Sequence, residues 1–401
     1  MRLLPFSVPL ALCLAIAPEA PVLAQAVNIR VANPSDFARP DEIVSVDWDD
    51  LRTRNANIAP GNVRVLDDSG AEVLSQAVDS DADGTTDALL FLGSLRPNES
   101  RTFTVEAAPP DEDIAARVLV MHDDYRDDMA WESDRMAYRT YGQALWNVPE
   151  FDPLVSSGID VWMKRVPDLI VERWYEKGAE AYHIDTGEGA DFYSVGTALG
   201  NGGTAIWTDG ELHRAQNFAG HRIIANGPIR AIFELTYVPW QAGDVEVSEI
   251  KRITVDAGQH LFKSESTFSV SGEAATPPGG TDDLTAAIGF VKRPGVVGAT
   301  KQANDGWAWL STWGPVQRGT GGHGDLGGAA IVDRSQLADM RETDDHYLAL
   351  LNAAPDDPVT AYVGAGWTAA GDFDSAEDWW AYLDTFVARL DAPVVVTMLG
   401  R

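Results

Sequence analysis

The chain has 401 residues, of which 30 are basic and 61 are acidic, so its formal net charge is -31. A field of this sign repels nucleic acids and anionic membranes, which are excluded as partners. The single cysteine, Cys13, lies in the first apolar stretch. Cleavage after that stretch would leave no disulfide, cysteine nucleophile or cysteine metal site.

Residues 1–26 have the pattern of a signal peptide. Arg2 supplies a positive charge, an apolar stretch follows at 10–16, and Ala24 and Ala26 form an A-x-A cleavage site. The apolar stretch is too short to span a bilayer, and no later stretch has the required length. The sequence therefore predicts a secreted or periplasmic protein without a membrane span.

Residues 27–108 show the period-two alternation of β-strands. Val44 and Val46 alternate with polar residues, as do Phe103 and Val105, and turn residues separate these runs. This pattern predicts a small N-terminal β-sandwich. The prolines and acidic residues that follow predict a linker over 109–116.

A short acidic loop within this first domain has the sequence D-S-D-A-D-G-T-T-D. Calcium takes six to eight hard oxygen ligands, and alternating aspartates around a tight glycine turn can supply several of them. The loop predicts a structural calcium site, with a solvated acidic turn as the alternative. The predicted ligands are Asp79, Asp81, Asp83 and Asp87.

Residues 117–401 are also dominated by strand patterns, expected at 159–163, 169–174, 229–237, 250–255 and 394–398. The clearest helix signal begins at Ser375, with Asp378 as its capping-box partner. Short strands joined by glycine-rich turns predict a large antiparallel β-sandwich. The fold class is therefore mostly β. No glycine pattern for a phosphate or a dinucleotide follows a strand, so no organic cofactor is expected.

Two polar segments carry the candidate chemistry. The first, 122–142, mixes aromatic residues, which stack on sugar rings, with arginines, which bind carboxylates. The second, 182–196, places a histidine, carboxylates and a phenol on a glycine-fixed loop, as an acid/base site would. The alternatives are a surface strand with solvated ion pairs for the first and a structural turn for the second.

In order along the chain, these motifs resemble the secreted bacterial family called domain of unknown function 4861. The resemblance rests on the aspartate loop, W-E-S-D-R-M-A-Y-R-T-Y-G, G-I-D-V-W-M-K-R-V, Y-H-I-D-T-G-E-G-A-D-F-Y-S-V-G and N-G-P-I-R-A-I-F-E-L-T-Y. It covers nearly the whole mature chain. Ser133 stands where a familiar version of the second motif has Asn.

The resemblance implies a carbohydrate-active enzyme. Members of this family accompany enzymes that dismantle acidic polysaccharides. The family is associated with a dehydratase that removes water from the uronic acid at the non-reducing end of ulvan oligosaccharides. It also implies that the large domain resembles the supersandwich of galactose mutarotases. An acidic oligosaccharide is therefore the expected partner, and a carbon–oxygen lyase the expected enzyme class.

The elimination requires a cation for the uronate carboxylate, a base for the C5 proton and an acid for the departing hydroxyl group. His183 and Tyr193 are the expected proton carriers, and Arg135 is the first candidate cation. The candidate catalytic residues are His183, Tyr193, Arg135 and, in reserve, His122. The candidate substrate-binding residues are Trp131, Glu132, Tyr138, Arg139, Lys164, Asp185 and Glu188.

Three alternatives stay open. If O4 of the uronate carried a sugar, the same groups would make a polysaccharide lyase. A glycoside hydrolase would use two carboxylates such as Glu132 and Glu188. A non-catalytic carbohydrate-binding protein would present an exposed aromatic platform, for example around Trp240 or Trp307.

Overall fold

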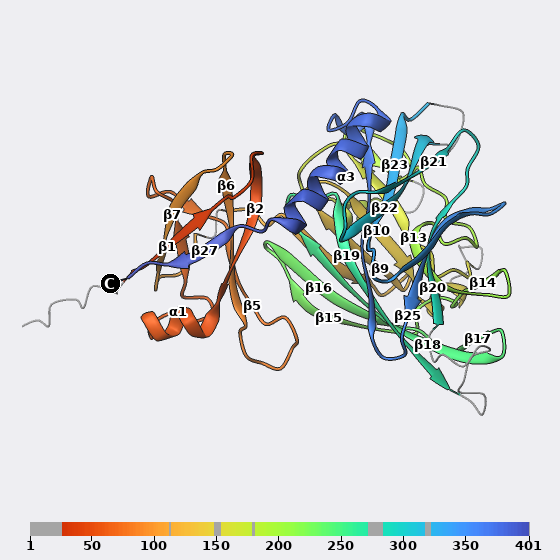
Figure 1. Cartoon of the computed structure of the whole chain (residues 1–401), viewed down its shortest axis with the longest axis horizontal. Helices are drawn as coiled ribbons and strands as arrows, with labels where there is room; N and C mark the ends of the chain where they lie inside the picture. Colours follow the sequence, from red (N-terminus) through yellow and green to blue (C-terminus); the bar gives the residue numbers. More distant parts are fainter. Residues whose placement is uncertain are drawn as a thin grey trace, which may run out of the picture.

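The computed structural model describes residues 26–111, 114–147, 154–178, 181–271, 284–316 and 322–400. All pairs of named strands within these ranges are antiparallel, and they form a small and a large β-sandwich (Figure 1). This confirms the predicted fold class. Within the same ranges no helix is long and apolar enough to cross a membrane. The predicted signal peptide lies outside the described residues, except for Ala26.

The small sandwich packs two sheets around one apolar core, which includes Val44, Phe91 and Phe103. Helix α1, Trp48–Arg54, covers one end of this core with its buried residues Trp48 and Leu51. The strands of the first sheet are β27 (Val395–Met398), β1 (Val27–Ala32), β7 (Ser100–Glu106), β3 (Arg64–Leu66) and β4 (Glu72–Val73). Those of the second are β2 (Arg39–Asp47), β6 (Ala88–Leu95) and β5 (Ser75–Val78).

The C-terminal strand β27 belongs to the small sandwich, which corrects the expected boundary of the large domain at 401. Met398 lies opposite Ile29 of β1, and Val395 lies opposite Ala32. Val396 and Met398 pack against the core of the small sandwich, and this burial accounts for their position. The chain thus leaves the small sandwich, builds the large one and returns (Figure 1).

The large sandwich contains three sheets. The first is β12 (Gly189–Ala190), β11 (Asp160–Lys164), β10 (Ala137–Tyr141), β9 (Asp128–Ser133) and β8 (Val118–Asp123). The second is β14 (Glu211–His213), β13 (Asn201–Thr208), β20 (Leu284–Val291), β25 (His346–Ala353) and β24 (Leu337–Glu342). The third is β15 (Gly220–Asn226), β16 (Arg230–Thr236), β18 (Val245–Asp256), β19 (Leu261–Ser271), β26 (Pro358–Trp367), β23 (Asp325–Asp333), β22 (Trp307–Pro315) and β21 (Val297–Gln302), with β17 (Trp240–Ala242) beside β18.

The helix predicted at Ser375 is confirmed as α3, Ala376–Asp391. The Ser375 hydroxyl accepts the N–H of Asp378, as a helix cap does. The strand predicted at 169–174 is wrong, because the segment forms helix α2, Val171–Lys177. The buried carboxylate of Glu132 accepts the N–H groups of Ile170 and Val171 and thereby satisfies the start of α2.

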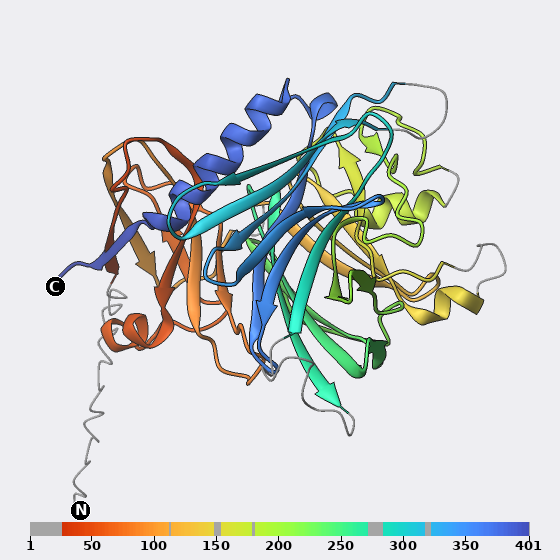
Figure 2. The same ribbon diagram turned by 45° about the vertical axis from the view of Figure 1, so that its right-hand side comes forward.

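The two sandwiches meet along an interface that combines apolar contacts, which include the buried Val78 and Leu90, with ion pairs. Arg117 binds Asp41 of the small sandwich at 2.9 Å, and Arg389 of α3 binds Glu42 there at 2.6 Å. Figure 2 shows α3 running along the large sandwich and leading into β27. Short 3-10 turns occur at Gln143–Asn147 (η1) and Thr368–Ala370 (η2), and η2 leads toward α3.

Candidate active site

The sheet that begins with β12 brings the two polar segments together. Arg139 of β10 lies opposite Asp160 of β11, and Met163 of β11 lies opposite Ala190 of β12. One face of this sheet joins the main core of the large sandwich, and the other carries charged residues beneath α2. Segments 122–142 and 182–196 are therefore neighbours in one structure.

A buried charge network occupies the α2-facing side of this sheet. The guanidinium of Arg139 binds three carboxylates, at 2.8 Å for Asp160, 3.0 Å for Asp191 and 3.5 Å for Asp128. Burial raises the pKa of Asp128 to about 7, and the charge of Arg139 opposes this rise. One cation among three carboxylates leaves a negative excess, which favours a protonated Asp128.

His183 is the link between this network and solvent. Its Nδ1 lies 3.0 Å from the backbone oxygen of Asp191 and 3.3 Å from the carboxylate of Asp191. Both partners are acceptors, so Nδ1 carries the proton and donates it. The His183 side chain is 23% exposed, whereas that of Asp191 is fully buried. Proton exchange with a substrate therefore falls to Nε2 of His183.

Asp191 is the carboxylate that orients His183, and the two carboxylates expected to bind substrate, Asp185 and Glu188, have other partners. Asp185 instead binds Arg165 at 2.7 Å and accepts the N–H groups of Gly187 and Gly189. Glu188 is held by Lys177, Trp174 and Arg173. The hydrogen bond from Lys177 lowers the pKa of Glu188 to about 2, although burial opposes this. Both carboxylates shape the loop that follows His183.

Four expected substrate contacts are sealed inside the protein, which corrects that expectation. Trp131 has no exposed surface; in the core it stacks on Tyr138 and packs at an angle against Phe233. Glu132 and Lys164 form a buried pair at 2.7 Å, and burial lowers the pKa of Lys164 despite Glu132. The Tyr138 hydroxyl donates to the backbone oxygen of His260. These side chains act as scaffold and do not reach a substrate.

Arg139 and Tyr193 are also buried. Arg139 is 8% exposed and is committed to its carboxylates. Tyr193 is 3% exposed, with the guanidinium of Arg293 at 4.7 Å from its ring. Burial raises the pKa of Tyr193 to about 12, so the phenol keeps its proton at neutral pH. The backbone N–H of Tyr193 donates to the carboxylate of Asp191 and helps to fix it.

Arg135 lies at the end of this sheet next to the small sandwich. Its guanidinium is 3.5 Å from Asp372 and 4.0 Å from Asp41, and its side chain is 35% exposed. His260 binds the same Asp372 at 3.2 Å. In the described part of the chain, Arg135 therefore contacts carboxylates other than Asp191, the one that His183 contacts. Arg165 is the residue that follows β11. Because β10 begins beside the end of β11, Arg165 and Arg135 lie at the same end of the sheet.

His122 occupies a separate surface cluster. Its ring stacks on His221 with 3.9 Å between centroids, and its two nitrogens contact Asp124 at 2.9 Å and Asp127 at 2.8 Å. A further cavity of about 770 Å³ lies beside β14 and β25 and is lined in part by Arg214. Neither feature includes His183.

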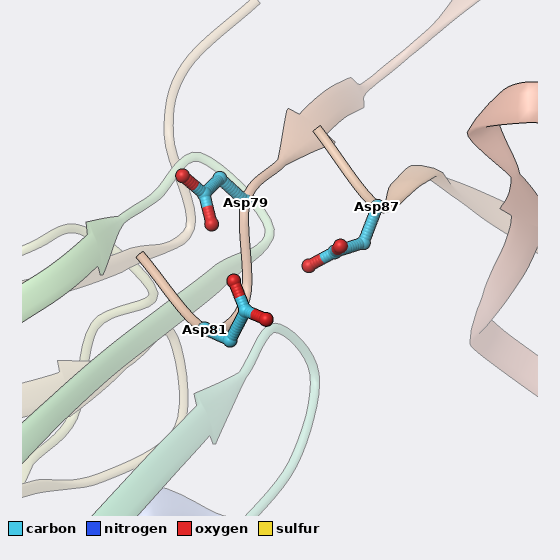
Figure 3. Close-up of side chains that lie close together, drawn as sticks. All are labelled: Asp79, Asp81 and Asp87. Atoms are coloured by element: carbon cyan, nitrogen blue, oxygen red, sulfur yellow. The ribbon is translucent and has the colours of Figure 1, made fainter. Parts of the chain in front are cut away.

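The acidic loop between β5 and β6 brings together three of its four expected ligands. Oxygens of Asp79, Asp81 and Asp87 lie within 4.8 Å of one another, and Figure 3 shows these side chains turned toward a common point. Asp83 is outside this group, and its carboxylate accepts the N–H of Thr85 at 2.7 Å. Three converging carboxylates fit a hard cation such as calcium.

Comparison with known proteins gives a full-length match to one family. The sequence profile described as Domain of unknown function (DUF4861) matches residues 31–396. A relative from Formosa agariphila, described as "Uncharacterized protein P7", is 30% identical over 383 residues, which covers 92% of this chain and 93% of the relative.

Two glycosidase structures show a weaker likeness. An α-mannosidase from Enterococcus faecalis is 11% identical with a TM-score of 0.48, over 94% of this chain and 46% of that chain. A family 36 α-galactosidase from Geobacillus stearothermophilus is 8% identical with a TM-score of 0.28, over 62% and 40% of the two chains. The chain spans about half the length of the mannosidase. At these values the likeness assigns no activity and no site.

Proposed function

The chain belongs to the DUF4861 family, and we propose that it removes water from the uronic acid at the non-reducing end of acidic, ulvan-like oligosaccharides. The product is an unsaturated uronate. In this carbon–oxygen lyase reaction, C5 loses a proton, the C4–O bond breaks, and the departing hydroxide takes up a proton to become water. The observation that carries the proposal is the partly exposed His183, held by the buried Asp191.

His183 is proposed as the base for the C5 proton. A neutral imidazole with Nδ1–H donated to a carboxylate presents an unprotonated Nε2, and the carboxylate stabilises the imidazolium that forms. The Arg139 guanidinium lies 3.0 Å from Asp191 and fixes the position of that carboxylate. The pair thus has the tautomer and the orientation that proton abstraction requires.

The C5 proton becomes acidic enough only when a cation neutralises the adjacent carboxylate. In a chain with a net charge of -31, an acidic sugar binds only where cations gather locally. A partly exposed arginine can meet this need, and the expected Arg135 is partly exposed, but the carboxylates it contacts, at 3.5 Å and 4.0 Å, are not the one that holds His183. Arg139 and Lys164 do not meet this need, since both are buried.

A glycoside hydrolase that uses Glu132 and Glu188 as its two carboxylates is not supported. Glu132 is fully buried beneath α2 and paired with Lys164, so it cannot meet a glycosidic bond. Glu188 is held by two cations and has a pKa of about 2, which is unsuited to a general acid. A polysaccharide lyase would use the same His183 site and is distinguished by its product.

We also propose export and a structural calcium ion. Export rests on the signal-peptide pattern, and β1 begins at Val27, directly after the expected cleavage site. The calcium ion would be held by Asp79, Asp81 and Asp87 on a loop whose Ser80 oxygen accepts a hydrogen bond from Arg252 of β18. Calcium there would order a loop that touches the large sandwich.

The experiment is incubation with saturated, uronate-ended oligosaccharides, followed by absorbance of the conjugated double bond and by chain-length analysis. A rise in absorbance without shortening supports dehydration, and a rise with shortening indicates a lyase. New reducing ends without absorbance would indicate hydrolysis. His183→Gln should abolish the signal, whereas the matched control His213→Gln should not. Full activity of the first variant would refute the site.

A further inference from the structure

Trp367, at the end of β26, anchors side chains from three separate segments. Its ring is fully buried, and its Nε1 donates to the backbone oxygen of His323 at 2.6 Å. The guanidinium of Arg165 lies 4.6 Å from the centre of the Trp367 ring. The imidazole of His323 stacks on Phe192 at 3.7 Å, and Phe192 in turn lies 6.0 Å from Trp367.

Arg165 is a surface cation already suited to a carboxylate. Its side chain is 37% exposed, its Nε donates to Asp185 at 2.7 Å, and its Nη1 donates to the oxygen of Ala369 at 2.8 Å. A guanidinium has five N–H donors, so these two contacts leave capacity for a second carboxylate. Burial raises the pKa of Asp185, but hydrogen bonds from Gly187 and Arg165 lower it below its usual value. Asp185 therefore stays ionised and orients Arg165.

The group around Trp367 is connected to His183 through one short segment. Asp191 holds His183, and the next residue, Phe192, stacks on His323. Asp185, two residues after His183, binds Arg165. A base, a second imidazole and a cation are thus attached to the same loop, 183–192. This is the set of groups that elimination from a uronate needs.

We propose that Arg165 binds the carboxylate of the terminal uronate and that His323 protonates the departing O4 hydroxyl group, with Trp367 positioning both. This assignment rests on the proposed function. His183 takes the C5 proton, the electron pair of that bond forms the C4–C5 double bond, and the C4–O bond breaks. The proton of His323 joins the leaving oxygen to give water. Both histidines return to their starting states by proton exchange with solvent.

The role of Arg165 is tested with two matched ligands, a uronate-ended oligosaccharide and the same compound with that carboxylate reduced to an alcohol. Calorimetry should show that the wild type prefers the uronate by about 10- to 100-fold, since charged hydrogen bonds are worth this much. Arg165→Gln should remove the preference. Arg222→Gln, which alters an exposed arginine paired with Glu234, should keep it. A preference retained in Arg165→Gln overturns the assignment.

The role of His323 is tested by two variants. His323→Gln removes the proton, and His323→Phe keeps a ring to stack on Phe192. Both should lower kcat by about 100-fold or more while leaving the Kd for substrate unchanged, and both should remove the limb of the pH–rate profile that reports the acid. Retention of kcat within about threefold in either variant overturns the assignment, since general acid catalysis is worth more than this.

The outcomes also separate this subsite from the proposed function. A wild type that neither binds nor dehydrates uronate-ended oligosaccharides refutes both. A wild type that does both, but is unaffected by Arg165→Gln and His323→Gln, refutes only the subsite. A kcat loss in His323→Gln that is reversed in His323→Phe would show that His323 acts through stacking alone and also overturns its role as an acid.

Discussion

The carboxylate of Asp191 lies between two nitrogen donors, 3.3 Å from Nδ1 of His183 and 3.0 Å from the guanidinium of Arg139. It is fully buried, while His183 reaches solvent. Because Arg139 belongs to β10, it holds Asp191 in place, and Asp191 in turn holds His183, the proposed base. The relationship makes Asp191 a positioning residue whose effect should appear in kcat.

Asp191→Asn should lower kcat by about 100-fold, because the amide neither fixes the tautomer of His183 nor stabilises its imidazolium. The KM for substrate should change little, and the acidic limb of the pH profile, which reports the base, should shift. Steady-state kinetics over a range of pH measure both effects. The exposed Asp357 provides the matched control, Asp357→Asn. An Asp191→Asn enzyme with normal kcat would contradict the role.

Arg139→Met should destabilise the protein by about 3–5 kcal/mol, because it leaves buried carboxylates without their cation. Arg222→Met, at an exposed pair with Glu234, should cost less than about 1 kcal/mol. Urea denaturation followed by tryptophan fluorescence compares the two free energies of unfolding. Equal losses would show that the network around Arg139 is not a distinct source of stability.

The raised pKa of Asp128, about 7 because of burial, predicts a pH-dependent stability. The folded state binds this proton more tightly than the unfolded state, so the contribution is complete below about pH 4 and is lost as the pH rises through about 7. Asp128→Asn should remove a loss on the order of 4 kcal/mol at about pH 8 but only about 2 kcal/mol at about pH 5. Urea midpoints at both pH values test this. Equal effects at the two pH values would contradict it.

Much of the fold followed from the sequence because alternation and capping are local signals. The helix at Ser375 was predicted from its cap, and β11 and β16 from their apolar runs. The segment at 169–174 was mistaken for a strand because a short apolar run fits both structures. The helix is favoured by Glu132, more than 30 residues away, because its carboxylate accepts hydrogen bonds from the first N–H groups of α2. The pairing of β27 with β1 is equally non-local.

The site was predicted only in part. The two segments were identified, but burial was not, so Trp131 and Glu132 were taken for substrate contacts. One signal was available in β11, where Trp162 and Lys164 alternate with Met163 and Arg165. Because the sheet is covered on both faces, the residue just past the strand end, Arg165, is the one that reaches solvent. Asp191 could not be selected among its neighbouring carboxylates without the position of His183.

Calcium should raise the melting temperature of the apo protein, and a chelator should reverse the rise, since an ion that binds only the folded state stabilises it. Asp81→Asn should abolish the shift, because Asp81 belongs to the converging group. Asp83→Asn should preserve it, because the carboxylate of Asp83 is not part of the converging group. Differential scanning fluorimetry with calcium and with magnesium measures these shifts. An unchanged response in Asp81→Asn would exclude this loop as the calcium site.

The most direct test of the account is the mass and ultraviolet spectrum of a single uronate-ended oligosaccharide before and after incubation with the protein. We expect a product lighter by one water, with the absorbance of an unsaturated uronate and the original number of sugar units, and no product with His183→Gln. A shortened chain, or an unchanged substrate under conditions in which the protein is folded, would contradict the claim that His183 and Asp191 form the centre of a dehydratase.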